Sequence, residues 1–111
     1  MIMSYCERKD AVVEDFEEFH DNLAYSVEQA LYAAIGEAEY ANDYTQTDEC
    51  CIYLNFALIL LKQKENISFM KVRLLELIES DKMEQYEIEL QDEFICFTQD
   101  IELLKDLLHD I

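Results

Sequence analysis

The sequence predicts an all-α protein, a compact bundle of four to five helices with a central apolar helix and a long C-terminal helix. Its 111 residues include one glycine and no proline, whereas small sheet-rich domains need many turns built from these two residues. Apolar residues make up 51% of the chain, and they recur in steps of three and four, as on the buried face of a helix. The length fits one acidic helical domain over residues 1–111.

The first helical segment should begin near Tyr5, because residues 4–7 have the form of a capping box. The apolar positions that follow are Val12, Phe16, Phe19, Leu23, Val27, Ala30 and Ala34. Their spacing predicts one buried helix face.

A kink or short turn is expected at Asp21 and Asn22, followed by a second capping box formed by Ser26 and Gln29. The second part of this segment should end near Ala41. Residues 42–47, NDYTQT, are the most loop-like stretch of the chain.

The next helix is expected to start after Thr47 as its N-cap and to run to about Lys64. Its centre, residues 56–61, is apolar on every side, which is typical of a helix wrapped by others. We therefore place it at the centre of the bundle.

A turn at Glu65 and Asn66 should lead into a shorter amphipathic helix capped by Ser68. The last segment shows one apolar seam, which predicts a helix of up to thirty residues. Its positions are Met83, Tyr86, Leu90, Phe94, Phe97, Ile101, Leu104, Leu108 and Ile111.

The net charge of −18 results from 26 acidic and 8 basic residues, far more than the magnitude of about 2–8 that solubility requires. Residues 1–49 hold 13 acidic and 2 basic residues, residues 50–82 hold 4 and 5, and residues 83–111 hold 9 and 1. Direct nucleic-acid binding is not expected, because phosphate contacts need clustered Lys and Arg. A basic protein is the natural partner of such a surface.

Catalytic and metal signals are weak. Glu17 and His20 have the Glu-x-x-His spacing of di-iron carboxylate bundles, and Asp106 and His109 form a looser analogue. A chain this rich in acids produces such spacings by chance, and its single glycine cannot build a phosphate-binding loop. We expect no enzymatic activity, no metal and no other cofactor, with a metal-dependent helical enzyme as a minor alternative.

The four cysteines, Cys6, Cys50, Cys51 and Cys96, lie in apolar helical patterns without a CxxC pair, which predicts free buried thiols in a reducing compartment. The most apolar stretch, residues 52–61, is too short for a bilayer, which needs about 20 residues. The expected location is the cytoplasm, without membrane association. We favour a monomer, with dimerisation through the seam of residues 90–111 as the alternative.

The stretch of residues 37–49, EAEYANDYTQTDE, combines five carboxylates with two tyrosines and contains no basic residue. Tyrosine supplies a large, stiff contact area at binding hot spots, and the surrounding carboxylates can pair with Lys or Arg of a partner. The predicted partner-binding residues are Glu37, Glu39, Tyr40, Asp43, Tyr44, Asp48 and Glu49. Of the tyrosines, Tyr40 and Tyr44 are expected to be exposed.

In length, acidity, helicity and this acid–tyrosine stretch, the chain resembles the immunity proteins of bacterial contact-dependent inhibition and other polymorphic toxin systems. The resemblance is one of type and implies an inhibitor that neutralises a cognate basic toxin, a nuclease, by covering its active site or substrate groove. The alternative is a phage anti-restriction or anti-CRISPR protein that mimics DNA. Acids at Glu7, Asp10, Glu14, Glu17, Glu18 and Asp21 would supply its row of phosphate-like charges.

Overall fold

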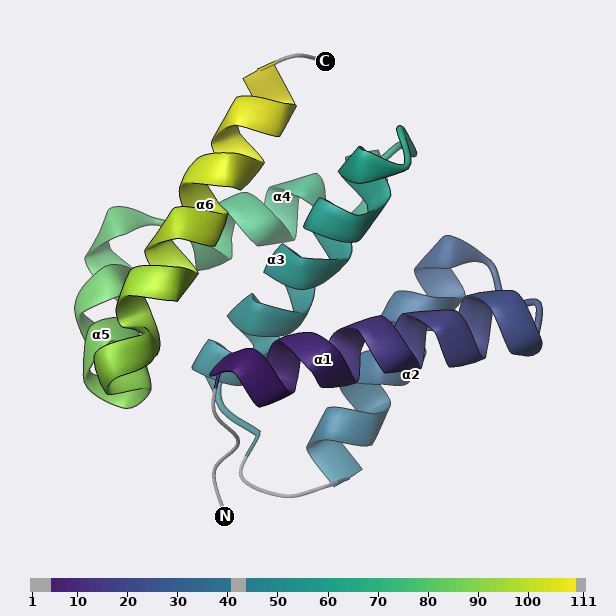
Figure 1. Cartoon of the computed structure of the whole chain (residues 1–111), viewed down its shortest axis with the longest axis horizontal. Coiled ribbons are helices and arrows are strands. Elements are labelled where there is room, and N and C mark those ends of the chain that lie inside the picture. The colour runs from purple at the N-terminus through teal and green to yellow at the C-terminus, as the bar shows by residue number, and fades with distance from the viewer. Residues whose placement is uncertain (1–4, 41–43, 110–111) are drawn as a thin grey trace.

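Helix α3, Gln46–Lys62, runs through the centre of the structure (Figure 1). The computed structural model describes residues 5–40 and 44–109, and within these ranges α3 contacts each of the other five α-helices. Twelve of its 17 residues are buried. Because a helix that is apolar all round must be covered on every side, the predicted central helix is confirmed.

The covering elements are helical as well. They are α1 (Tyr5–Phe16), the six-residue π-helix η1 (Glu17–Asn22), α2 (Val27–Tyr40), α4 (Ser68–Leu77), α5 (Met83–Leu90) and α6 (Phe94–His109), with short 3₁₀ turns η2 (Ser80–Lys82) and η3 (Gln91–Glu93). Within the described residues, 5–40 and 44–109, there is no strand. Five of the six α-helices found there have ten or more residues. The prediction of an all-α bundle with a long C-terminal helix is confirmed.

The helices form two layers. In Figure 1, α1 and α6 lie on the near side of the molecule and α2 and α4 on the far side. The principal extents are 37 × 35 × 20 Å, and the shortest corresponds to about two helix diameters. The molecule is therefore a thick disc, and α1 and α2 present long outer faces.

Aromatic side chains join the start of α1 to α5 and α6. The ring of Phe97 packs edge-on against Tyr5 and Tyr86, with centroid distances of 5.7 and 5.5 Å. The Tyr5 hydroxyl donates to the Asp100 carboxylate, and burial together with this carboxylate raises the pKa of Tyr5. This cluster fixes the N-terminal end of α1 against α6.

The chain breaks where the sequence predicts, between α1 and α2. Ser26 and Gln29 form the expected capping box, with the Ser26 N–H donating to Gln29 Oε1 at 3.0 Å and the Gln29 N–H donating to Ser26 Oγ at 3.2 Å. Helix α1 begins at Tyr5, whereas the cap expected at Ser4 lies outside the described residues.

Two predicted helix caps are wrong. Helix α3 is capped by Thr45, whose Oγ1 accepts from the Asp48 N–H at 3.2 Å, and Thr47 is buried in its first turn. Helix α4 has Ile67 as its N-cap, without a side-chain bond. Ser68 instead donates its N–H to Asn66 Oδ1 at 2.8 Å.

The last segment is not one helix of thirty residues, because it bends at Gln91. This residue has φ 53° and ψ −122°, a backbone conformation that glycine adopts freely and other residues rarely. The bend turns α6 back against α5, so that Tyr86 of α5 and Phe97 of α6 meet in the core.

In the described part of the chain, residues 5–40 and 44–109, no helix has both the length and the apolarity needed to cross a bilayer.

Replacing Gln91 with glycine should raise the free energy of unfolding by about 1 kcal/mol, because it relieves a left-handed conformation at a non-glycine residue. Gln99→Gly is the matched control: it lies exposed inside α6, where glycine should lower stability by about 1 kcal/mol. Urea denaturation of both variants measures the two signs. A loss of stability in Gln91→Gly would contradict the prediction.

Candidate functional site

The densest acidic region is the unit formed by α1, η1 and α2. Residues 5–40 contain ten acidic residues and two basic ones, Arg8 and Lys9. The exposed acids of this unit are Glu7, Asp10, Glu14, Glu17, Glu18, Asp21, Glu28, Glu37 and Glu39. We call these nine residues the acidic surface.

The two basic residues of this unit form ion pairs with other helices. The Arg8 Nε lies 2.6 Å from Asp48 Oδ1 on α3, and the side chains are 11% and 17% exposed. Lys9 Nζ lies 3.0 Å from Asp100 Oδ2 on α6. Both cations thus connect α1 to its neighbours α3 and α6.

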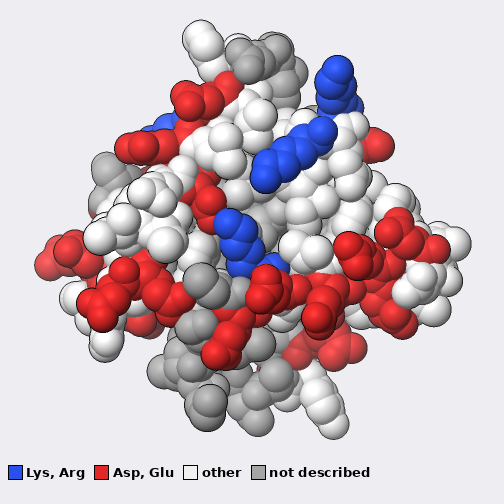
Figure 2. All heavy atoms as spheres, viewed as in Figure 1, with Lys and Arg blue, Asp and Glu red and all other residues white. Residues whose placement is uncertain are grey.

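Charge on the visible face is unevenly distributed, with most of the acidic side chains in one band and others above it. Figure 2 shows Asp and Glu side chains in a band along α1, with Lys and Arg side chains above that band. A surface of one sign focuses the electric field and accelerates the approach of an oppositely charged partner. A surface of this kind would attract cations.

Helices α1 and α2 contribute to one continuous acidic region. Asp15 of α1 is partly buried, and its pKa is raised first by burial and then by the charges of Glu37 on α2 and Glu14 on α1. Like charges are therefore held close across the contact between α1 and α2. Such repulsion lowers stability, and binding of a cation would relieve it.

Of the seven predicted partner-binding residues, the three at the end of α2 lie open to solvent. Glu37 and Glu39 are exposed, and the Tyr40 side chain is 89% exposed. The expected exposure of Tyr40 is confirmed. Asp43 lies outside the described residues.

Tyr44 is half-buried, so its expected exposure is wrong. Its ring packs against the core, and its hydroxyl is buried without a hydrogen-bond partner in the described part of the chain. Burial, together with the nearby charges of Glu49 and Glu39, raises the pKa of Tyr44. The ring of Tyr44 therefore contributes to the packing of the bundle.

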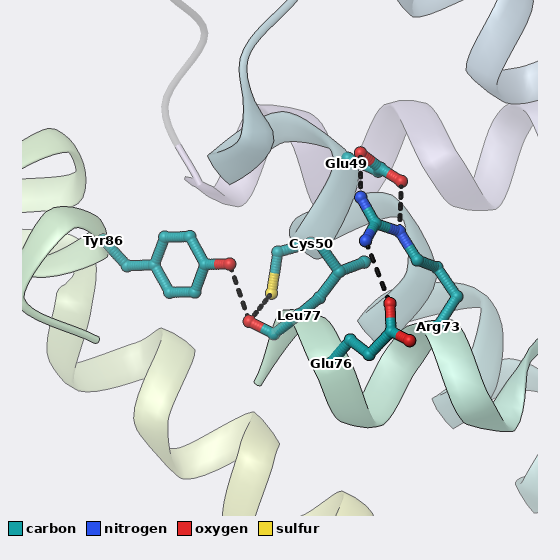
Figure 3. Close-up of polar contacts among 6 residues, drawn as sticks. All are labelled: Glu49, Cys50, Arg73, Glu76, Leu77 and Tyr86. Carbon is teal, nitrogen blue, oxygen red and sulfur yellow. Dashed lines mark hydrogen bonds and ion pairs between the residues drawn. The ribbon is translucent and has the colours of Figure 1, made fainter. Parts of the chain in front are cut away.

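Asp48 and Glu49 have internal roles. Asp48 accepts from the Thr45 N–H at 2.9 Å to close the capping box and also pairs with Arg8. Glu49 receives two bonds from Arg73 of α4, at 2.9 and 3.0 Å, as Figure 3 shows. Arg73 Nη1 also lies 3.2 Å from Glu76. The carboxylates of Asp48 and Glu49 thus connect α3 to other helices, and they are poorly placed to bind a partner.

The thiols of Cys50 and Cys51 are not activated, because burial raises the pKa of both. Cys50 and Cys51 are free and buried, as predicted, and burial raises the pKa of Cys50 to about 12. Both the Cys50 Sγ and the Tyr86 hydroxyl donate to the Leu77 carbonyl oxygen, at 3.7 and 2.6 Å (Figure 3). Cys96 is exposed, against the expectation of burial.

His20 is engaged within the chain. Its ring stacks on Phe16 at 5.1 Å, and its Nδ1 lies 2.9 Å from the Tyr25 carbonyl oxygen. Glu17 and His20 both belong to the π-helix η1, so the Glu-x-x-His spacing does not have α-helical geometry. Within the described ranges, no group of three or more His, Cys, Asp and Glu side chains could hold a metal ion.

Two further tyrosines, Tyr25 and Tyr32, are exposed near α2. Tyr32, on α2, is 53% exposed, and Tyr25, before α2, is 39% exposed and stacks on Phe19 at 5.6 Å. Tyr53 of α3 lies close enough to Tyr32 and Glu49 for their charges to help burial raise its pKa. Tyr32 and Tyr40 thus add aromatic area beside the acidic surface.

The sequence did not predict an open cavity between α1, η1 and the end of α3, which is lined by Val13, Phe16, Glu17, Asp21, Ile59, Lys62 and Gln63. The available signal was the run of residues 17–22, EEFHDN, at the predicted break.

Comparison of the chain with protein-family models, curated proteins and solved structures found no match.

Replacing Asp48 with alanine should lower the free energy of unfolding by about 2 kcal/mol, because it removes one half of the capping box and leaves Arg8 unpaired. Chemical denaturation checks this loss. The matched control is Glu39→Ala, an exposed position, where the change should stay within about 0.5 kcal/mol. Equal effects of the two substitutions would contradict the structural role of Asp48.

Asp15→Asn should stabilise the protein by roughly 0.5 kcal/mol at neutral pH. The pKa of Asp15 is raised in the folded state, so folding opposes its charge. The penalty is absent below the ordinary pKa of an aspartate, and it grows until the pH exceeds the raised folded-state pKa. Thermal unfolding from acid to neutral pH should therefore show a difference that appears as pH rises. Asp10→Asn, at an exposed position of α1, should show a smaller difference.

Proposed function

We propose that this protein is an inhibitor of the immunity-protein type. It binds a cognate basic toxin, a nuclease, and neutralises the toxin by covering its active site or substrate groove. The observation that carries this proposal is the acidic surface, nine exposed carboxylates on α1, η1 and α2.

The chemistry of a nuclease groove supports this choice of partner. Such grooves hold the phosphates of their substrate with Lys and Arg side chains. Carboxylates on a rigid helix can take the place of those phosphates, and complementary charge accelerates association and orients the partner. The inhibitor itself needs no reaction for this role.

The aromatic residues beside the acids favour one tailored partner. Tyr40 is 89% exposed and Tyr32 is 53% exposed, so both rings are available for contact. Large aromatic side chains supply much of the binding energy in protein interfaces. A contact area that combines such rings with carboxylates can distinguish one basic protein from another.

DNA mimicry is the second candidate function, and the row of acids on α1 and η1 favours it. Glu7, Asp10, Glu14, Glu17 and Asp21 follow one another at steps of three or four residues, and all are exposed. Successive members rise by about 5 Å along the helix axis. A mimic should bind several DNA-binding proteins and lose affinity steeply with salt.

We expect the cognate toxin to be a basic protein encoded beside this chain. The triple variant Glu37→Ser, Glu39→Ser, Tyr40→Ala should weaken binding to this protein by at least tenfold, or about 1.4 kcal/mol. The three side chains are exposed, so the fold should be intact by circular dichroism. Calorimetry of the purified pair measures the affinity.

The matched control changes Glu84, Glu87 and Glu89 of α5 to serine, which removes three exposed carboxylates from another helix. Its affinity should change less than threefold. A larger loss in the α5 variant would move the interface to the C-terminal acids. Absence of binding at low salt would overturn the proposed inhibitor, and equal binding to unrelated DNA-binding proteins would favour mimicry.

A further inference from the structure

The open cavity beside the acidic surface has a volume of about 280 Å³. Pockets for small-molecule substrates usually measure about 300–1,000 Å³, so this one suits a single side chain of a partner. It lies between the end of α1, the π-helix η1 and the end of α3.

The inner wall of the cavity is apolar and held in place. Phe16 is 4% exposed, and its ring contacts Phe56 edge-on at 5.5 Å and stacks on His20 at 5.1 Å. Val13 and Ile59 extend this wall. Because the side chains of this wall are already ordered, an aliphatic stem can bind to it without a further loss of their conformational entropy.

Two carboxylates lie at the edge of this wall. Glu17 and Asp21 belong to η1 and are both exposed. Lys62 of α3 also lines the cavity, yet within the described residues no ion pair joins it to either carboxylate. The cavity therefore combines an apolar wall with two carboxylates that form no ion pair within the described residues.

We propose that this cavity receives one arginine side chain of the basic partner. Its aliphatic stem lies on Val13, Phe16 and Ile59, while its guanidinium binds the carboxylates of Glu17 and Asp21. This inference rests on the proposed function and assigns an anchor point to the interface.

Arginine fits better than lysine for two reasons. Its guanidinium is planar, carries five N–H donors and can bond two carboxylate groups at once. It is also more weakly hydrated than an ammonium group, so it enters a partly apolar cavity at lower cost. The stem of a long basic side chain packs on apolar surface while its head stays polar.

Substitution of Lys62 should change the affinity in the direction opposite to substitution of Glu17 or Asp21. A cation on the far rim repels an incoming guanidinium, so its removal should strengthen binding, whereas removal of Glu17 or Asp21 should weaken it. Nonspecific attraction to an acidic protein responds alike to any lost carboxylate. Around physiological salt the screening length is about 8 Å, which limits the influence of carboxylates outside the cavity.

The experiment is an NMR titration of the full chain with N-acetyl-arginine methylamide, following the side-chain amide of Gln63 and the backbone amides of residues 17–22. The arginine probe should saturate these shifts. N-acetyl-lysine methylamide should bind at least threefold more weakly, and the uncharged citrulline analogue should not saturate. Failure of the arginine probe to saturate, or equal binding of the citrulline analogue, overturns the inference.

Variants decide whether the cavity is responsible. Glu17→Gln and Asp21→Asn should each weaken the arginine probe at least threefold, and Lys62→Met should strengthen it about threefold. The controls are Glu14→Gln and Glu18→Gln, which remove the same charge from exposed positions outside the cavity and should change binding less than twofold. Equal effects in controls and cavity variants overturn the inference.

Binding to the basic protein encoded beside this chain separates the two proposals. If the double variant Glu17→Gln, Asp21→Asn binds that protein normally while the triple variant in α2 binds weakly, the cavity inference fails and the proposed function stands. If the unaltered chain does not bind that protein at low salt, the proposed function fails.

Discussion

The burial of α3 on every side is the constraint on which the rest of the structure depends. Its twelve buried residues include the apolar run around Phe56, and contact with five other helices covers them. The covering helices must turn their apolar faces inward and their polar faces outward. The acidic residues are therefore concentrated in an outer shell around a nearly neutral central helix.

A shell of like charges destabilises the compact state through self-repulsion, and the fold offsets part of this with cations at helix junctions. Arg8 joins α1 to α3, Lys9 joins α1 to α6, and Arg73 joins α4 to α3. Each cation pairs with a carboxylate that is less than a quarter exposed. Charge-assisted bonds of this kind fix orientation as well as adding energy, so the few cations orient helices more than they neutralise the surface.

Periodicity was sufficient to predict the helices, and it was insufficient for the details that depend on single backbone angles or distant partners. The break near Asp21 and the capping box at Ser26 follow from local sequence. The cap at Thr45 was missed because Thr47 is an equally good cap by composition. The bend at Gln91 lies within an uninterrupted apolar seam, and nothing in a glutamine signals a positive φ.

Some of the predicted partner-binding residues are exposed and others are engaged in tertiary contacts. The spacing of residues in the sequence does not reveal these contacts. Glu37, Glu39 and Tyr40 remained exposed, whereas Asp48 and Glu49 met Arg8 and Arg73 from distant parts of the chain. The cavity was also unpredictable, because Ile59 and Phe16 belong to separate helices and each appears in the sequence as ordinary core.

The pairing of Arg8 with Asp48 and of Lys9 with Asp100 has a consequence for the charge of α1 itself. In the extended chain these two cations stand between Glu7 and Asp10 and partly cancel them. Folding holds both cations at the junctions of α1 with α3 and α6, so the charge pattern of α1 in the folded protein differs from that of its local sequence. A partner that senses this arrangement of charge would distinguish the folded chain from nascent or denatured molecules, so recognition would also serve as a check on conformational integrity.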